Sequence, residues 1–261
     1  MDLSGYSLET IFLASAIVFL LAIELGRAFG ARESKDSNIS TLEAAVLGLL
    51  ALMISFTFSM ALNRFEARRE ALLAEANAIG TTALRARLLP APQRDASLAL
   101  LRDYVQIRLE VVQGEGAPAA LRRSSEIQEA LWREARSLAV KDNAMVPTGL
   151  FIQTLNETFD DQQKRLTILA NRVPNIVFLA LYGVAAVAFV FTGYSGAPGK
   201  LSWRPPAYVM ATLVAGVILL IQDLDRPTAG FIAVSQQPMI DTAKAIDGYL
   251  SAAKAESSPR K

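Results

Sequence analysis

The stretch LGLLALMISFTFSMALNRFEARREALLAEANAIGTTALRARLLP, residues 47–90, decides the fold of this chain. Its first part is apolar over nearly its whole length, as is typical of a helix that crosses a membrane. Its second part repeats apolar residues at helical spacing between charged ones, as is typical of a helix in a water-soluble bundle. No proline interrupts it before Pro90, so the sequence predicts one long helix that leaves the membrane and continues into a soluble domain.

Three other stretches come close to the roughly 20 apolar residues that a helix needs to cross a bilayer. They run over about 8–29, 174–194 and 206–221, and the long helix provides a fourth span at about 42–62. No stretch alternates between apolar and polar residues as a half-buried strand does. The sequence therefore predicts an all-α fold, with four transmembrane helices and long helices that extend into a cytoplasmic helical bundle.

These spans divide the chain into four parts. We expect residues 1–64 to hold transmembrane helices 1 and 2, 65–172 to form the cytoplasmic domain, and 173–222 to hold transmembrane helices 3 and 4. Residues 223–261 form a cytoplasmic C-terminal tail, whose end from Ser251 onward is small and charged and is expected to be disordered. Basic residues near the spans are more numerous on the side of the domain, so the positive-inside rule favours cytoplasmic N- and C-termini.

The composition argues against an enzyme. The chain has 261 residues, of which 52% are hydrophobic, and it contains neither cysteine nor histidine. It therefore lacks thiolate nucleophiles, the commonest general base and the commonest ligands of transition metals. We expect no catalytic residues and no cofactor. The net charge of +1 also gives no indication of a nucleic-acid partner.

The second span carries a stripe of small and increasingly polar side chains at steps of three or four residues. Its members are Ala44, Gly48, Ala51, Ser55, Ser59 and Asn63. One hypothesis is that the stripe lines an ion pore, with Phe56 among the bulky neighbours that form a hydrophobic constriction. The alternative is that small residues only allow helices to pack closely. Four spans are too few to enclose a pore, so the first hypothesis requires a ring of copies around this helix.

Charged residues follow two of the spans. Arg64 and Glu66 come after the second span and are candidates for the electrostatics at the inner mouth of a pore. Asp223 and Asp225 come after the fourth span, where carboxylates oppose the helix dipole. Arg226 could compensate them and anchor the tail, or a hard cation could bind there through oxygen atoms. The sequence leaves both interpretations open, and with them the question of a metal.

Two motifs resemble a known family. FTFSMALNRFEARREALLAEANAIGTTALRARLLP, residues 56–90, and DLDRPTAGFIAVSQQP, residues 223–238, are similar to the bestrophin-like family of bacterial membrane proteins, known largely as a domain of unknown function. The resemblance implies a protein of the bacterial inner (cytoplasmic) membrane. This family is distantly similar to true bestrophins, which are pentameric anion channels gated by calcium, with the second span around the pore. No run of acids matches the bestrophin calcium clasp, so the resemblance does not extend to calcium gating.

We therefore expect an oligomeric ion channel with transmembrane helix 2 lining the pore, conducting anions by analogy with bestrophins. Its expected partners are the lipid bilayer, further copies of the chain and a permeant inorganic ion. Neutral serine and asparagine side chains suit ions of either sign, so a cation-selective channel of the same architecture is an alternative. A further alternative is a non-conducting membrane scaffold or sensor whose cytoplasmic bundle binds a partner.

Overall fold

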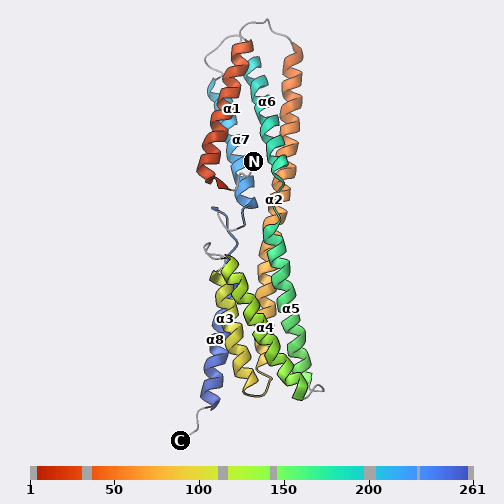
Figure 1. Ribbon diagram of the computed structural model, residues 1–261. Helices are drawn as coiled ribbons and strands as arrows, with labels where there is room; N and C mark the ends of the chain where they lie inside the picture. Colours follow the sequence, from red (N-terminus) through yellow and green to blue (C-terminus); the bar gives the residue numbers. More distant parts are fainter. Residues whose placement is uncertain are drawn as a thin grey trace. The chain divides into compact units, whose positions relative to one another are not determined.

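The chain is helical wherever its structure is described. The computed structural model describes residues 5–30, 37–110, 117–141, 146–196, 204–227 and 230–257. Within these ranges it forms eight helices and no strand, which confirms the predicted all-α class (Figure 1). The helices are α1 (Leu8–Gly30), α2 (Ser37–Ala86), α3 (Gln93–Glu110), α4 (Ala117–Lys141), α5 (Val146–Ala170), α6 (Asn175–Ser195), α7 (Arg204–Asp225) and α8 (Gln237–Ser257).

The helices divide between two compact units. Unit 1 comprises Met1–Phe65 and Asn171–Ala233, and unit 2 comprises Glu66–Ala170 and Val234–Lys261. Helices α1, α6 and α7 belong to unit 1, while α3, α4, α5 and α8 belong to unit 2. The 50-residue helix α2 supplies residues to both units, as the uninterrupted stretch before Pro90 predicts.

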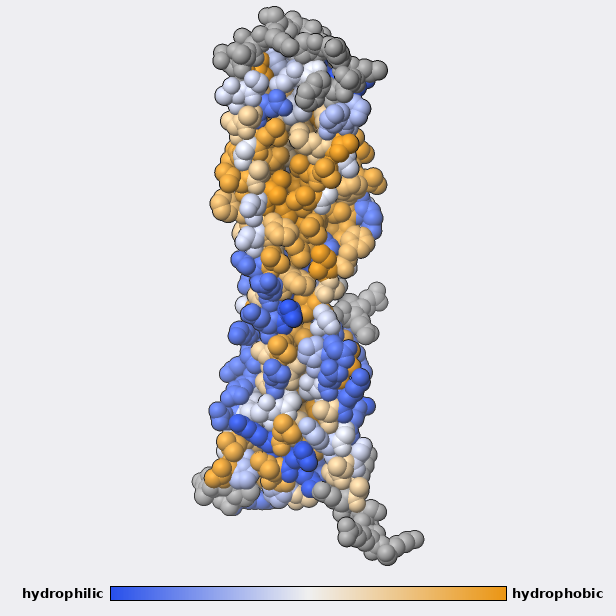
Figure 2. All heavy atoms as spheres, turned by 180° about the vertical axis from the view of Figure 1, so that it is seen from behind, coloured by the Kyte–Doolittle hydropathy of each residue, from blue (hydrophilic) through white to orange (hydrophobic). Residues whose placement is uncertain are grey.

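Four helical stretches are long and apolar enough to cross a membrane. They are Leu8–Gly30, Ile39–Ala86, Val146–Ser195 and Arg204–Asp225, and each contains one of the four predicted spans. On the face drawn in Figure 2, apolar side chains cover most of unit 1, whereas charged and polar ones predominate on unit 2. Helix α7 continues four residues past the predicted end of the fourth span, so Asp223 and Asp225 lie in its last turn.

Unit 1 is built on a close contact between α1 and α6. Helix α1 packs most extensively on α6 and next on α7. Gly26 of α1 lies against the carbonyl oxygen of Val190, and Gly193 of α6 lies against the carbonyl oxygen of Ile23. A methyl group at either glycine would overlap that oxygen, so the absence of a side chain sets the distance between the two helices.

Helix α2 packs on unit 1 with one face only. Leu50 and Ala61 are buried in the apolar core that α1, α6 and α7 form, and Thr57 is buried beside them. The Thr57 hydroxyl donates to the carbonyl oxygen of Met53, 2.7 Å away, so its polar group is satisfied within the helix. This packing fixes which side of α2 is turned away from the rest of its own chain.

Unit 2 has its own apolar core and includes helix α8, which was not predicted from the sequence. Leu98 and Leu101 of α3 meet Leu131 of α4 and Phe151 of α5 in this core. Helix α8 packs on α3 and buries Ile246 and Ala253. The expectation of disorder from Ser251 onward is therefore wrong for residues 251–257, which complete α8.

Candidate functional site

The side of α2 that faces away from unit 1 carries all five predicted pore residues. Gly48, Ser55, Phe56, Ser59 and Asn63 are each exposed, and they are referred to below as the exposed α2 face. Phe56 has 71% of its surface exposed. A methyl group added to Gly48 would have no atom within 4 Å. The structure thus places these residues together on one helix face that no described part of the same chain covers.

This exposure bears on the two interpretations of the small-residue stripe. Close packing between helices of the same chain does not account for it, because the residues of α2 that pack on unit 1 lie on the opposite face. Two exposed leucines accompany these residues: Leu49 at the edge of the exposed α2 face, and Leu52 on it between Ser59 and Asn63, and both suit contact with lipid or with an apolar surface. The hydroxyls of Ser55 and Ser59 and the amide of Asn63 are poorly suited to contact with lipid. These three residues form a polar strip on α2, which is suited to a second protein surface or to water.

The two charged residues proposed for the inner mouth lie in different environments. Arg64 is half-buried, whereas Glu66 is exposed. Asn63, Glu66 and Glu70 follow one another at steps of three and four residues in α2, and all three are exposed. The charges that extend the polar strip beyond Asn63 are therefore acidic, and the guanidinium of Arg64 is turned toward the packed side.

The aspartates at the end of α7 bind backbone groups. Asp223 is 2% exposed, and its carboxylate accepts hydrogen bonds from the N–H groups of Phe231 at 2.8 Å and Ile232 at 3.0 Å. Asp225 is 7% exposed and accepts from the N–H of Val173, at 2.9 and 3.2 Å to its two oxygens. Three backbone donors thus compensate carboxylates that would otherwise oppose the helix dipole.

The neighbours of these aspartates favour an anchoring role over a cation site. Arg226 donates from Nη2 to the carbonyl oxygen of Tyr6 at 2.6 Å and so ties the end of α7 to the start of the chain. Among the residues that the structure describes, no group of three or more acids is arranged to hold a metal ion. Gly230, at φ +157°, lies against the Asp223 carboxylate, where a side chain would collide with it.

Unit 1 also contains polar contacts between its apolar helices. Tyr208 of α7 donates a hydrogen bond to Glu24 of α1, and Arg27 lies 3.9 Å from the same carboxylate. Tyr182 was not among the predicted site residues, and its hydroxyl lies 3.1 Å from the Ser15 hydroxyl and 3.2 Å from the Gln222 amide nitrogen. These contacts cross-link α1, α6 and α7, which is the usual role of polar side chains between membrane helices.

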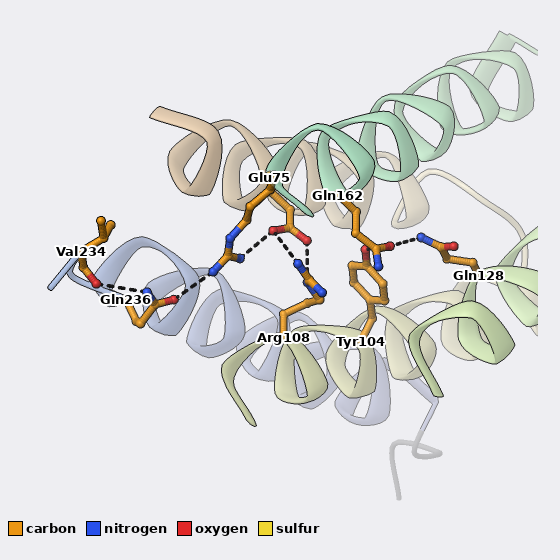
Figure 3. Close-up of polar contacts among 8 residues, drawn as sticks. Glu75, Tyr104, Arg108, Gln128, Gln162, Val234 and Gln236 are labelled. Atoms are coloured by element: carbon orange, nitrogen blue, oxygen red, sulfur yellow. Dashed lines mark hydrogen bonds and ion pairs between the residues drawn. The ribbon is translucent and has the colours of Figure 1, made fainter. Parts of the chain in front are cut away.

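The core of unit 2 holds a charged cluster that was not among the predicted sites (Figure 3). Glu75 of α2, Arg108 of α3 and Arg165 of α5 are 0%, 1% and 4% exposed. Beside them the Tyr104 hydroxyl donates to the Gln162 side chain at 2.7 Å, and Gln128 donates to the same oxygen. One signal was available in the sequence: Glu75 occupies a position between Leu72, Ala76 and Ile79, on the apolar side of α2.

Comparison with known proteins gives a consistent family and fold. A family model described as a Bestrophin-like domain matches residues 11–239. Crystal structures of a bacterial bestrophin homologue from Klebsiella pneumoniae have the same fold. One variant superposes with a TM-score of 0.69 at 14% identity, covering 93% of this chain and 97% of that one. A second superposes with a TM-score of 0.70 at 13% identity, covering 94% and 98%. None of the curated proteins matches the sequence.

Proposed function

The chain belongs to the Bestrophin-like family of membrane proteins, and on that premise we propose that it forms an oligomeric ion channel whose pore is lined by the exposed α2 face. The observation that carries the proposal is the polar strip at Ser55, Ser59 and Asn63, exposed on a helix whose other side packs on its own chain. Several copies arranged around α2 would turn these strips toward a common axis, where water and an ion could contact them.

The free-energy cost of placing these polar side chains in lipid supports this arrangement. In the hydrocarbon core of a bilayer, a serine hydroxyl can bond only to the backbone of its own helix, and an asparagine amide loses hydrogen bonds to water that the helix does not fully replace. Within a ring, the same hydroxyls and amides would replace part of the hydration shell of a permeating ion. Phe56, exposed at the flank of the strip, would narrow the path and supply a hydrophobic constriction.

The charges in line with Ser59 and Asn63 favour a cation-selective pore over the anion-selective pore that the similarity to true bestrophins implies. Glu66 and Glu70 continue the strip after Asn63, and a ring of carboxylates at a pore entrance concentrates cations. Arg64, which would favour anions, is half-buried on another side of α2. Anion conduction then remains the second candidate, supported by the family relationship alone.

The proposed location is the bacterial inner membrane, with both chain termini in the cytoplasm. The four apolar helices support a membrane location, and the excess of basic residues on the side of the helical domain supports the orientation. Residues 66–170 would then form the core of a cytoplasmic domain to which Val234–Lys261 contributes.

Flux measurements in liposomes that hold the purified protein test the proposal. Potassium and chloride are measured separately, for the wild type and for Ser59→Trp. Leu213→Trp is the matched control, because Leu213 is an exposed apolar residue of α7, outside the proposed pore. We expect potassium flux in the wild type and in Leu213→Trp, and its loss in Ser59→Trp because an indole fills the strip. The double variant Glu66→Gln, Glu70→Gln tests selectivity and should lower the preference for potassium.

Other results of the flux measurements would change the proposal in defined ways. Chloride flux blocked by Ser59→Trp would retain the pore and replace the cation by an anion. Flux that persists in Ser59→Trp would remove α2 from the pore. No flux of either ion from a well-formed oligomer would favour the non-conducting scaffold or sensor, in which unit 2 binds a partner.

A further inference from the structure

The charged cluster in unit 2 has an unbalanced charge. It consists of two guanidinium groups, on Arg108 and Arg165, and one carboxylate, on Glu75, all at least 96% buried (Figure 3). Guanidinium groups remain protonated in proteins, so the cluster carries a net charge of about +1. A buried charge that lacks a counter-charge is strongly destabilising, because the interior solvates it far less well than water does.

Both oxygens of the Glu75 carboxylate already accept hydrogen bonds. Its Oε1 accepts from Arg108 Nε at 2.7 Å, and its Oε2 accepts from Arg165 Nη1 at 2.6 Å and from Arg108 Nη2 at 3.4 Å. The groups that form hydrogen bonds beside the cluster are neutral, and a further acid, Asp161, lies close enough to act electrostatically on Glu75 but is only half-buried. Arg165 Nη2 donates to the Gln236 side chain at 3.3 Å, and burial raises the pKa of the nearby Tyr104 hydroxyl, which keeps it protonated.

One donor of the cluster is left over. Arg108 Nη1 is buried and has no hydrogen-bond partner among the residues that the structure describes. Its N–H groups are fixed in direction, because Nε and Nη2 of the same planar guanidinium are held by Glu75. The unsatisfied donor therefore belongs to a buried cluster in which guanidinium groups outnumber carboxylates, and one ligand could reduce both costs.

We propose that Arg108 Nη1 binds a small monovalent inorganic anion, of the chloride type, inside unit 2. A water molecule would satisfy the N–H but leave the positive charge uncompensated, whereas a halide satisfies both. Because Arg108 Nη1 is fully enclosed, an ion of about the size of a water molecule is favoured over a phosphate or an organic acid. This ion is a structural counter-ion, and the inference does not depend on whether the protein conducts.

Anomalous diffraction tests the site directly in the wild-type protein. The full chain is crystallised in bromide, whose anomalous signal distinguishes it from water. An anomalous peak within hydrogen-bonding distance of Arg108 Nη1 is the expected result. A water molecule at this position, or no density above that of the surrounding core, would overturn the proposal.

Thermal stability gives an independent measurement. At constant ionic strength, chloride in place of gluconate should raise the Tm of the detergent-solubilised wild type by about 2–4 °C, the size expected for a bound ligand in a chain of this length. In Arg108→Gln, which leaves one carboxylate facing one guanidinium, the rise should disappear. Arg102→Gln is the matched control, since Arg102 lies on the same helix in an exposed ion pair with Asp247, and it should keep the rise. An equal rise in all three proteins would mean a non-specific salt effect and would refute the site.

Discussion

At the residue scale, Asp223 shows how a carboxylate can be stabilised in the last turn of a helix, where the dipole is unfavourable. The backbone N–H groups of Phe231 and Ile232 both point at it, so the negative charge is compensated by donors that the chain itself returns to the site. Gly230 makes this return possible, because a side chain there would occupy the position of the carboxylate.

Replacing Asp223 by alanine should release residues 230–232. Two part-buried hydrogen bonds would be lost, and we expect a loss of stability of about 1–3 kcal/mol. Amide hydrogen exchange should become faster at Phe231 and Ile232, and mass spectrometry of peptides from this segment measures it. Asp241→Ala removes an exposed carboxylate and should leave the exchange unchanged. Unaltered protection in Asp223→Ala would show that other contacts hold the segment.

Tyr104 should make unit 2 sensitive to alkaline pH. Burial is the main cause that raises the pKa of its hydroxyl above the ordinary value, and the negative charge of Glu75 adds to it. Above pH about 10 the unfolded chain loses this proton while the folded chain retains it, so the free energy of unfolding falls as pH rises.

Thermal melts between pH 9 and 12 test this expectation. In Tyr104→Phe the Tm should fall less steeply above pH about 10 than in the wild type. At neutral pH the same variant should be less stable by about 1 kcal/mol, because it loses the hydrogen bond to Gln162. Tyr249→Phe, which alters a tyrosine on α8 beneath the Arg87 guanidinium, should follow the wild-type curve. If the Tm fell equally steeply with pH in all three proteins, Tyr104 would not be the cause of the alkaline sensitivity.

At the element scale, the contact between α1 and α6 depends on two glycines. Gly26→Ala and Gly193→Ala each place a methyl group on a backbone carbonyl of the facing helix, and backbone cannot move aside as a side chain can. We expect a loss of about 1–3 kcal/mol, seen as a lower Tm and less monodisperse protein on gel filtration. Gly183→Ala, on the same helix α6 with nothing within 4 Å, should behave like the wild type or better. A normal Tm for Gly26→Ala would mean that the helices separate at little cost.

The helices themselves were largely predictable from the sequence. Long apolar runs and the position of prolines located the four apolar helices and the long α2, because these are local properties of the chain. The end of α7 was placed too early, since Asp223 and Asp225 are polar, and only their distant backbone donors explain their burial. Helix α8 was not predicted, because its stability comes from packing on α3.

For the candidate sites too, local sequence patterns were predictive, whereas features that depend on tertiary packing were not. Helical spacing was enough to place Ser55, Ser59 and Asn63 on one face, and the structure adds that this face is exposed. The different environments of Arg64 and Glu66 could not be predicted, because they depend on which side of α2 packs on unit 1. The cluster of Glu75, Arg108 and Arg165 could not be predicted either, since its members come from three helices that only tertiary packing brings together.

At the scale of the whole molecule, the proposed channel requires several copies. The chain contains no cysteine, so a single introduced cysteine reports one contact without a background. In native membranes, oxidation of Ser59→Cys should give disulfide-linked dimers, because copies around a common axis bring this position close to its equivalents. Leu213→Cys, exposed on α7, should remain monomeric on the same gel. If only Leu213→Cys forms dimers, the copies meet through α7 and the proposed ring is wrong.

The glycine contact between α1 and α6 also limits how this sequence can evolve. In most of a protein core, a mutation to a larger residue can be offset by a smaller one opposite, and the two positions then change together. Gly26 and Gly193 have no such compensating partner, because each faces a carbonyl oxygen that every residue possesses. Relatives that keep this helix crossing should therefore retain both glycines, while the side chains around them diverge.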